Sequence, residues 1–521
     1  MNPSLPAPAL RGGFSPRPKR PSIWLLLPVL FLVGLSLLPL AYVGLKAWQA
    51  GWAEAVHLIW RPYVFGLLRN TLALMAGVTV TCAVIGLSLA WLLERSNLPG
   101  RRIWGVILCL PFAVPAFVSS FTWVSLSASF EGLGGAILVM SLSKYPLVFL
   151  PVAATLRNLD PSLEESARTL GLNRWGVFFR ITLPLLWPSL LAGALLIALH
   201  MLVEFGALSI IGLQTFTTAI YQQFELEFSN ANAAMLSAVL LVMCLTLLWL
   251  ELRVRGKGRH VRIGQGAARH AEQVRLGQWA PLGQVYCLAL AIIGSGIPLG
   301  MLGYWLAVGS SAAFPVAEIG EALLSSLALS LAGAALCLVL AVPVGLLVVR
   351  YKGRLAIWAE RLPYLLHALP GLVIALTLVY FALHYVPALY QTSALLLIAY
   401  ALLFLPLAQA PIRTALNKAA PQLEDAARTL GASSFSAFCR VTLPIIFPAL
   451  GAAFALVFLD AMKELTATLL LSPTGLNTLA TAVWAHTSNV EFAAAAPYAA
   501  LLILVSGLPV YVLTTRIYLS R

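Results

Sequence analysis

Four charged residues stand at the ends of long apolar segments, where they could attract or pass a cation: Glu204, Asp460, Lys463 and Glu464. Glu204 and Glu464 each follow a Leu-Pro pair by 20 residues, about one membrane thickness of helix. Asp460 and Glu464 have the i,i+4 spacing of neighbours on one helix face, and Lys463 supplies a local counter-charge. These residues predict a gate or cation path at the outer mouth of a membrane protein. The alternative is that they anchor helix ends and pair locally.

The residue pattern gives little support for a catalytic function. The histidines are scattered, with His200 and His367 in or near apolar segments, and none forms a His-x-x-x-His or His-Cys cluster. The six cysteines lack metal-ligand spacing and are expected to be small buried residues. No Gly-x-x-x-x-Gly-Lys-Ser/Thr loop occurs, the segment 256–258 being the nearest. We therefore predict no catalytic residue and no cofactor bound by this chain, and we leave any metal site unassigned.

A charged, amphipathic segment occurs twice, at residues 164–184 and 424–444. Between Pro161 and Ala192, 16 of 32 residues are identical to those 260 positions later. This agreement indicates an internal duplication. We call residues 157–184 and 413–444 the first and second charged loops. The residues that we assign to their function are Glu164, Glu165, Ala167, Arg168, Gly171, Leu183 and Pro184 in the first loop, and Glu424, Asp425, Ala427, Arg428, Gly431, Leu443 and Pro444 in the second.

Each charged loop is expected to fold as a short helix, a turn and a second short helix. Asp160 is placed to cap the first helix, Gly171 and Gly431 to end it in the left-handed conformation, and Asn173 and Ser433 or Ser434 to cap the second. The Glu-x-x-x-Arg spacing predicts a pair within the first helix, and each Leu-Pro pair is expected to break the second. Such a knob suits a cleft of another protein; the alternative is an amphipathic hairpin lying on the bilayer.

The composition is that of an integral membrane protein, with 60% hydrophobic residues, 10% charged residues and a mean hydropathy of +0.90. We predict an all-α fold of about twelve transmembrane helices in two parallel six-helix repeats, because an even number of spans leaves both repeats in the same orientation. The predicted spans are 23–45, 66–92, 104–126, 136–156, 185–206 and 232–252, then 280–307, 323–349, 363–383, 392–412, 445–463 and 494–515. Prolines recur at matching depths: Pro115 with Pro370, and Pro151 with Pro406.

Basic residues predict the orientation of these spans. All Lys and Arg residues except Lys46, Arg61, Arg69, Lys144 and Lys463 fall on one side, together with both charged loops. The positive-inside rule makes that side cytoplasmic and accounts for the net charge of +14 without nucleic acid. The predicted organisation is a cytoplasmic tail (1–22), a first repeat (23–252), a cytoplasmic linker (253–279), a second repeat (280–515) and a cytoplasmic tail (516–521). The basic linker is expected to lie near anionic membrane lipid.

The charged loops resemble the EAA loops of bacterial ABC-importer permeases. The matching residues are Glu165-Ser166-Ala167, Gly171, Ile181, Leu183 and Pro184, and then Asp425-Ala426-Ala427, Gly431, Val441, Leu443 and Pro444. Ser166 and Asp425 depart from the family pattern, so the two loops are unequal. The resemblance implies that the loops contact two copies of an ATPase subunit, which bind the ATP and Mg that this chain does not.

The resemblance further implies an inner-membrane permease that receives its substrate from a periplasmic or extracellular binding protein. The outer segments 212–223 and 473–484, with Lys463-Glu464-Leu465, are most similar to the fused permeases of ferric iron importers. Ferric iron is therefore the expected cargo, and thiamine or another small solute is the alternative. An ion-gradient-driven secondary transporter is the competing class, but it would need an ionisable site near the bilayer midplane, and the acids gather at span ends.

Overall fold

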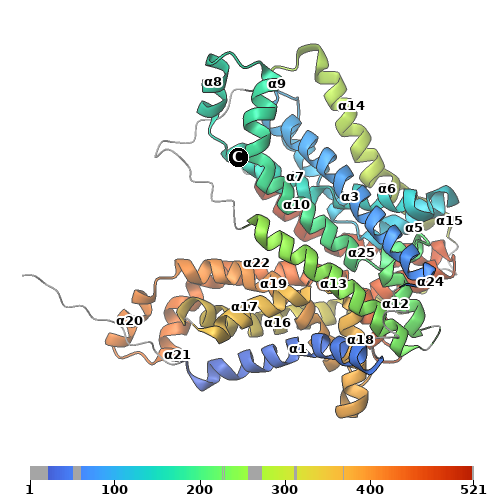
Figure 1. Cartoon of the computed structure of the whole chain (residues 1–521), viewed down its shortest axis with the longest axis vertical. Helices are drawn as coiled ribbons and strands as arrows, with labels where there is room; N and C mark the ends of the chain where they lie inside the picture. The colour runs from blue at the N-terminus through green and yellow to red at the C-terminus, as the bar shows by residue number, and fades with distance from the viewer. Residues whose placement is uncertain are drawn as a thin grey trace, which may run out of the picture.

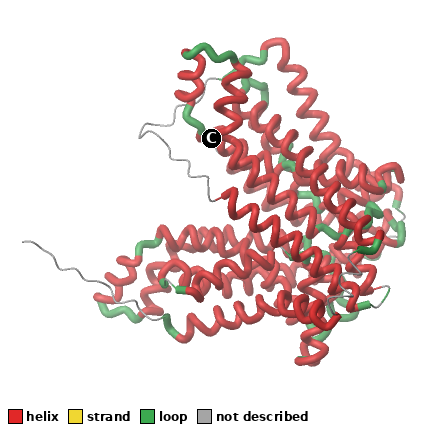
Figure 2. The backbone as a smooth tube through the Cα atoms, in the orientation of Figure 1, coloured by secondary structure: helices red, strands yellow, loops and turns green. Residues whose placement is uncertain are grey.

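The computed structural model describes residues 21–50, 60–225, 227, 229–255, 273–309, 314–351, 353–367 and 369–518. These residues form helices joined by short loops (Figure 2), and their only strand-type pairing is an isolated bridge between Ser96 and Val274. The expected all-α fold is confirmed. Most of the predicted tails and most of the predicted linker lie outside the described residues.

Along the chain, the helices of the second half occur in the same order as those of the first half (Figure 1). The first half contains α1 (Ile23–Ala50), α3 (Pro62–Arg95), α4 (Arg101–Ile107), α5 (Ala116–Leu126), α6 (Gly132–Lys144), α7 (Pro146–Asn158), α8 (Pro161–Thr169), α9 (Arg174–Val177), α10 (Leu183–Val203), α11 (Gly206–Ile210), α12 (Phe216–Glu225) and α13 (Asn230–Arg255). The second contains α14 (Ala280–Ala291), α15 (Ile297–Val308), α16 (Val316–Arg350), α17 (Arg354–His367), α18 (Gly371–Tyr385), α19 (Ser393–Lys418), α20 (Pro421–Thr429), α21 (Ser434–Ala437), α22 (Leu443–Met462), α23 (Thr466–Leu471), α24 (Leu479–Ser488) and α25 (Phe492–Tyr518).

Among the described residues, nine helical segments are long and apolar enough to cross a membrane, or eleven if two sharply bent pairs each count as one span. Helix α25 supplies a shorter apolar stretch at the position of the twelfth predicted span. The bent pairs replace the third predicted span of each repeat, with bends of 87° and 109°. Pro115 and Pro370 stand immediately before α5 and α18. Pro151 and Pro406 instead lie inside the continuous helices α7 and α19.

The prediction that each Leu-Pro pair breaks a helix was wrong. A continuous helical segment runs from Arg174 to Val203 in the first half and from Ser434 to Met462 in the second. A π-helical turn, Phe178–Thr182 or Phe438–Thr442, directly precedes each Leu-Pro pair. The wider π turn accommodates the proline ring and its missing N–H, so the helix continues. Each charged loop is therefore joined rigidly to a membrane helix.

Two arms of helices diverge at the ends that carry the charged loops (Figure 1). In one arm α3, α7 and α10 pack together, and in the other α16, α19 and α22 make the equivalent contacts. The first span of each half crosses to the other arm. Val29 and Leu32 of α1 join the apolar core of the second arm, and Cys287 and Leu290 of α14 join that of the first. This exchange ties the two arms together.

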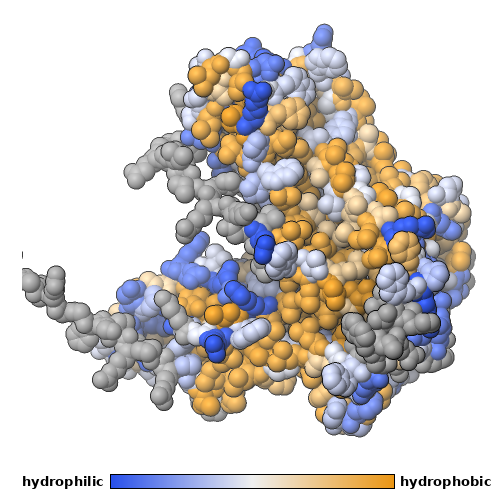
Figure 3. Space-filling model, in the orientation of Figure 1, coloured by the Kyte–Doolittle hydropathy of each residue, from blue (hydrophilic) through white to orange (hydrophobic). Residues whose placement is uncertain are grey.

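The arms are packed at the end away from the charged loops. Phe117 and Phe121 of α5 share an apolar cluster with Leu465, Leu479 and Val483 of the second half. The Ser506 hydroxyl donates a hydrogen bond to the Ala113 carbonyl across the same junction at 3.1 Å. On the charged-loop side, the space-filling view is hollowed between the arms (Figure 3). The structure is thus open between the charged loops and closed at the far end.

Close packing within the first arm gives a stability prediction. A Cβ atom at Gly86 would lie 2.9 Å from the Phe149 backbone nitrogen, whereas one at Gly451 would meet nothing within 4 Å. Gly86→Ala should therefore destabilise the protein by about 1–3 kcal/mol through overpacking. Gly451→Ala, the matched control in α22, should be neutral or stabilising because alanine favours the helix. The measurement is thermal unfolding of the detergent-purified variants. Equal unfolding temperatures for the two variants would contradict this packing.

Candidate functional site

The charged loops adopt the local structure that their capping residues predict. The Asp160 carboxylate accepts a hydrogen bond from the Ser162 N–H at 3.0 Å, and Asn173 Oδ1 accepts one from the Gly176 N–H at 2.7 Å. In the second loop Ser433 Oγ accepts from the Ser436 N–H at 3.2 Å. Gly171 and Gly431 have φ of +87° and +90°, the left-handed conformation that ends the first helix. The predicted helix–turn–helix is present in both loops.

An ion pair, largely buried in the first loop and partly buried in the second, holds each charged loop against its own arm. Glu164 Oε1 lies 3.1 Å from Nη2 of Arg95 at the end of α3, and the two side chains are 13% and 5% exposed. The same carboxylate oxygen accepts a hydrogen bond from the Thr182 hydroxyl at 2.9 Å. This pair replaces the predicted pair with Arg168, which is exposed. The carboxylate turns inward because the guanidinium of Arg95 is buried there and needs a counter-charge.

The second charged loop repeats this arrangement. Glu424 Oε1 lies 3.0 Å from Nη2 of Arg350 at the end of α16 and accepts a hydrogen bond from the Thr442 hydroxyl. Arg350 Nη2 also donates to the Ala419 carbonyl at 3.3 Å. Arg428, expected to pair with Glu424, instead lies 3.8 Å from Asp425 and donates to Ser434 Oγ at 2.5 Å. Two equivalent three-residue clamps thus join the loops to the arms.

The outer faces of both loops combine charged and apolar side chains. Glu165, Arg168, Asp425 and Pro184 are exposed, as is Pro444, while Ala167 is buried and Leu183, Leu443 and Ala427 are half-buried. Next to them, Leu170 is 85% exposed and Leu430 is 89% exposed. Trp175 and Phe435 occupy equivalent exposed positions after the turn. Exposed apolar side chains at the same places in both loops form a surface suited to a protein partner.

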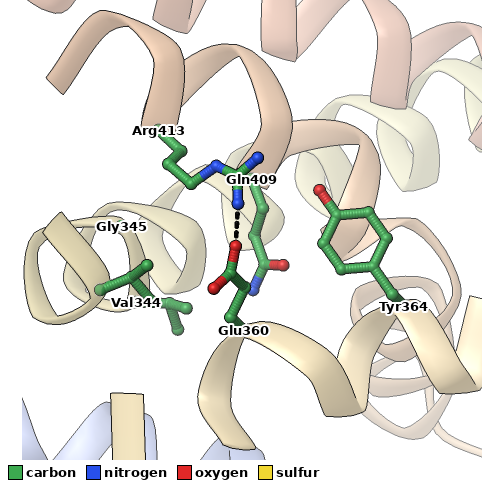
Figure 4. Close-up of a pocket in the computed structure, with 7 residues that line it drawn as sticks. Val344, Gly345, Glu360, Tyr364, Gln409 and Arg413 are labelled. Atoms are coloured by element: carbon green, nitrogen blue, oxygen red, sulfur yellow. Dashed lines mark hydrogen bonds and ion pairs between the residues drawn. The ribbon is translucent and has the colours of Figure 1, made fainter. Parts of the chain in front are cut away.

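Further ion pairs, which were not predicted from the sequence, fix the helix ends near the charged loops. Arg157 Nη2 on α7 lies 2.5 Å from Glu94 Oε1 on α3. In the second half Arg413 on α19 points at Glu360 on α17 (Figure 4). Beside this pair lies a cavity of about 10 Å³, room for a single water. These contacts serve to hold helices in register.

Glu204 and Glu464 lie at equivalent helix breaks at the closed end. Glu204 Oε1 accepts a hydrogen bond from the Ala207 N–H at 3.3 Å, and Glu464 Oε1 accepts one from the Ala467 N–H at 2.7 Å. Each carboxylate stands just before the N-cap residue and binds an N–H in the first turn of the short helix that follows, α11 or α23. These bonds are the local anchoring that the sequence left open as the alternative to a cation path.

The other charged residues of this region connect the two halves. Lys463 Nζ donates to the Phe112 carbonyl of the first half at 3.2 Å, and Lys144 Nζ lies 4.0 Å from Glu204 Oε2. Asp460 is exposed on the last turn of α22. Lys144 was not among the predicted residues, although it was one of the few basic residues outside the predicted cytoplasmic side. Acidic and basic groups thus gather where the arms meet.

Aromatic packing and helix breaks complete this junction. The rings of Tyr221 and Trp484 lie 5.8 Å apart across the two halves. Burial, followed by the nearby Glu225, raises the pKa of Tyr221 to about 12, so its phenol is uncharged at neutral pH. A Cβ on Gly206 would lie 2.6 Å from Leu465, and one on Gly371 would lie 3.3 Å from Glu464 Oε1. The breaks around Glu204, Pro370 and Glu464 therefore converge at one place.

Within the part of the chain that the structure describes, no cluster of three or more His, Cys, Asp or Glu side chains could hold a metal ion. His200 Nδ1 lies 2.8 Å from the Leu196 carbonyl, and His367 Nδ1 lies 2.7 Å from the Leu403 carbonyl. Five cysteines are buried and Cys439 is partly buried, as expected of packing residues. The histidines are accordingly engaged with the backbone of the helices around them.

Comparison with known proteins places both halves in one family. Residues 82–254 and 338–518 match the family described as the binding-protein-dependent transport system inner membrane component. The chain is 46% identical to the Fe(3+)-transport system permease protein FbpB 2 of Haemophilus influenzae over 501 residues, which is 95% of this chain and 99% of that protein. It is 32% identical to the sulfate transport system permease protein CysT of Escherichia coli over 250 residues, 43% of this chain and 90% of the relative.

The clamp predicts different effects for two adjacent glutamates. Glu164→Ala leaves the Arg95 guanidinium buried without its counter-ion and should cost about 3–5 kcal/mol of local stability. Amide hydrogen exchange of residues 161–182 should then accelerate. Glu165→Ala, the control at an exposed neighbour, should leave exchange unchanged. Equal protection in the two variants would mean that the ion pair does not hold the loop.

Proposed function

The chain belongs to the family of binding-protein-dependent transport system inner membrane components, and from this premise we propose that it imports ferric iron as the permease of an ATP-driven transporter. The observation that carries the proposal is the pair of equivalent charged loops, each clamped to one arm by an ion pair that is at least partly buried. Identity to an Fe(3+)-transport permease over nearly the whole chain supports the choice of cargo. Members of this family are inner membrane components of transport systems. We therefore assign the hydrolysis of ATP to a partner subunit.

Two copies of an ATPase subunit are the proposed partners of the charged loops. The exposed leucine and aromatic side chains of each loop would enter a cleft of one copy, with Glu165 or Asp425 at its edge. ATP and Mg would be bound by those subunits. When the ATPase pair closes on ATP, it would draw the two loops together. Because each loop is clamped to a continuous membrane helix, the arms would follow as rigid levers.

Movement of the arms would open the closed end. The apolar cluster around Phe117 and Leu465 and the contact between Tyr221 and Trp484 would separate as the loops approach one another. A binding protein on that face would then release its ion into the junction. The carboxylates of Glu204, Asp460 and Glu464 would favour a cation there, and Lys144 and Lys463 would limit its residence. The ferric ion in this scheme is the cargo and does not need a permanent site.

The proposed location is a bacterial inner membrane with the charged loops and both termini in the cytoplasm. The distribution of basic residues supports this orientation. Thiamine or another small solute is the alternative cargo for the same architecture. A gradient-driven secondary transporter is the alternative class, and it would leave the two clamped loops without a partner. An uptake assay distinguishes these alternatives by the solute that accumulates and by whether uptake requires the ATPase.

Uptake of radiolabelled ferric iron tests the proposed function directly. Cells that carry the permease with its cognate ATPase and binding protein should accumulate iron, and Glu165→Ala with Asp425→Ala should reduce uptake severalfold by weakening the loop contact. The matched control is Glu131→Ala, an acid outside the charged loops. Radiolabelled thiamine should not accumulate. Thiamine uptake would overturn the cargo, and uptake that persists without the ATPase would overturn the ATP-driven mechanism.

A further inference from the structure

A cavity of about 840 Å³ lies under the first charged loop. Its walls come from α3, from α8 and α9 of the loop, and from the start of α14, three segments that meet in the upper arm of Figure 1. This volume is within the roughly 300–1,000 Å³ of ligand-binding pockets. The cavity therefore has the size of a binding site, and it lies outside the proposed cargo path.

The wall formed by the second half is tied firmly to the first. The Val274 N–H donates to the Arg95 carbonyl at 2.8 Å, and the Asn97 N–H donates to the Val274 carbonyl at 3.2 Å. Gln284 Nε2 donates to the Pro99 carbonyl at 2.7 Å. The hydroxyl groups of Ser88 and Tyr286 lie 2.7 Å apart within the cavity lining. The site is thus built from a fixed framework and is not a gap between loose helices.

The polar part of the cavity is suited to an anion. Arg95 is 5% exposed, and only its Nη2 faces the carboxylate of Glu164. Its three guanidinium nitrogens are buried, and apart from the ion pair of Nη2 with Glu164 they have no hydrogen-bond partner within the described chain. Arg168, Arg174 and Arg275 also line the cavity, and Glu164 is the single acid among its lining residues. Four guanidinium groups against one carboxylate leave a site that an anionic group would satisfy.

The remaining lining residues are aromatic or aliphatic. A lining of this kind favours an amphiphilic ligand over a free anion. Trp91, Trp175 and Trp279 stand around the cavity with Leu282. Trp175 is 71% exposed and Trp279 is 64% exposed. Tryptophan and arginine together are typical of the headgroup level of a bilayer, and basic pockets between membrane helices bind anionic headgroups. A free phosphate would leave these apolar walls uncovered, whereas acyl chains would cover them.

The second half lacks this combination at the equivalent positions. Ser434 stands where the first half has Arg174, and Leu346 where it has Trp91. Arg350, the counterpart of Arg95, likewise has Nε and Nη1 without a hydrogen-bond partner in the described residues, although its Nη2 has the Ala419 carbonyl as a second partner. The difference between the halves therefore lies in Arg174 and Trp91, which the second half lacks.

We propose that this cavity binds one anionic phospholipid, with its phosphate at Arg174 and Arg275, beside the buried Arg95, and its acyl chains against α3 and α14. The lipid would fill the space between the first charged loop and a helix of the other half. It would therefore support the loop that carries the clamp of Glu164 and Arg95. The site is separate from the proposed cargo path, and it shares Trp175 with the loop surface proposed to contact the ATPase.

Native mass spectrometry of the purified full chain tests this site. The chain is given phosphatidylglycerol or phosphatidylcholine with identical acyl chains, and we expect one phosphatidylglycerol to be retained with at least a tenfold preference. Arg174→Ser with Arg275→Ser should reduce that preference about tenfold or more. Arg180→Ser with Arg440→Ser removes the same charge outside the cavity lining and should retain it. Trp91→Leu, which introduces the residue of the second half, should weaken retention without unfolding.

Three results would overturn the proposal. Equal retention of phosphatidylcholine would remove the headgroup selectivity. An unchanged preference in the Arg174 and Arg275 double variant, with Trp91→Leu also unchanged, would place the lipid elsewhere. Loss of phosphatidylglycerol on adding millimolar inorganic phosphate, without effect of acyl-chain length, would identify a site for a free anion.

Discussion

The partly or largely buried ion pair between a loop glutamate and an arginine at the end of a long helix is the constraint on which the structure depends. Glu164 with Arg95, and Glu424 with Arg350, hold the charged loops in a fixed orientation on the two arms. An ion pair of this kind adds little net stability, but breaking it leaves a charge without compensation. The loops are therefore fixed in orientation, which a surface that transmits force requires.

Rigidity continues from the clamps into the membrane helices. The π turns before Pro184 and Pro444 let each loop continue into a membrane helix. At 1.5 Å per residue, each of these helices is about 45 Å long. At the far end the same helices stop at Glu204 and Glu464, whose carboxylates bind an N–H in the first turn of the next short helices. The exchange of α1 and α14 between the arms holds the halves together. A movement imposed at the loops can thus reach the junction where the charges gather.

Local features of this molecule could be predicted from the sequence, and long-range partners could not. The caps at Asp160, Asn173 and Ser433 and the left-handed glycines follow from short-range chemistry, and the duplication revealed both loops. The partner of Glu164 could not be found, because Arg95 lies far away in the chain and Arg168 has ideal helical spacing. The Leu-Pro pairs were misread because a π turn has no clear residue signature. The exchange of first spans likewise depends on tertiary packing.

The most direct test of the account measures distances with pairs of spin labels in the assembled transporter. One pair stands at Ser162 and Gln422 on the charged loops, and the other at Ser129 and Asn489 toward the far end, in a chain with Cys439→Ala. On adding ATP, the first distance should shorten and the second should lengthen. In Glu164→Ala with Glu424→Ala, the loop distance should still change while the far distance stays constant. A far distance that responds equally without the clamps would contradict the claim that they transmit the movement.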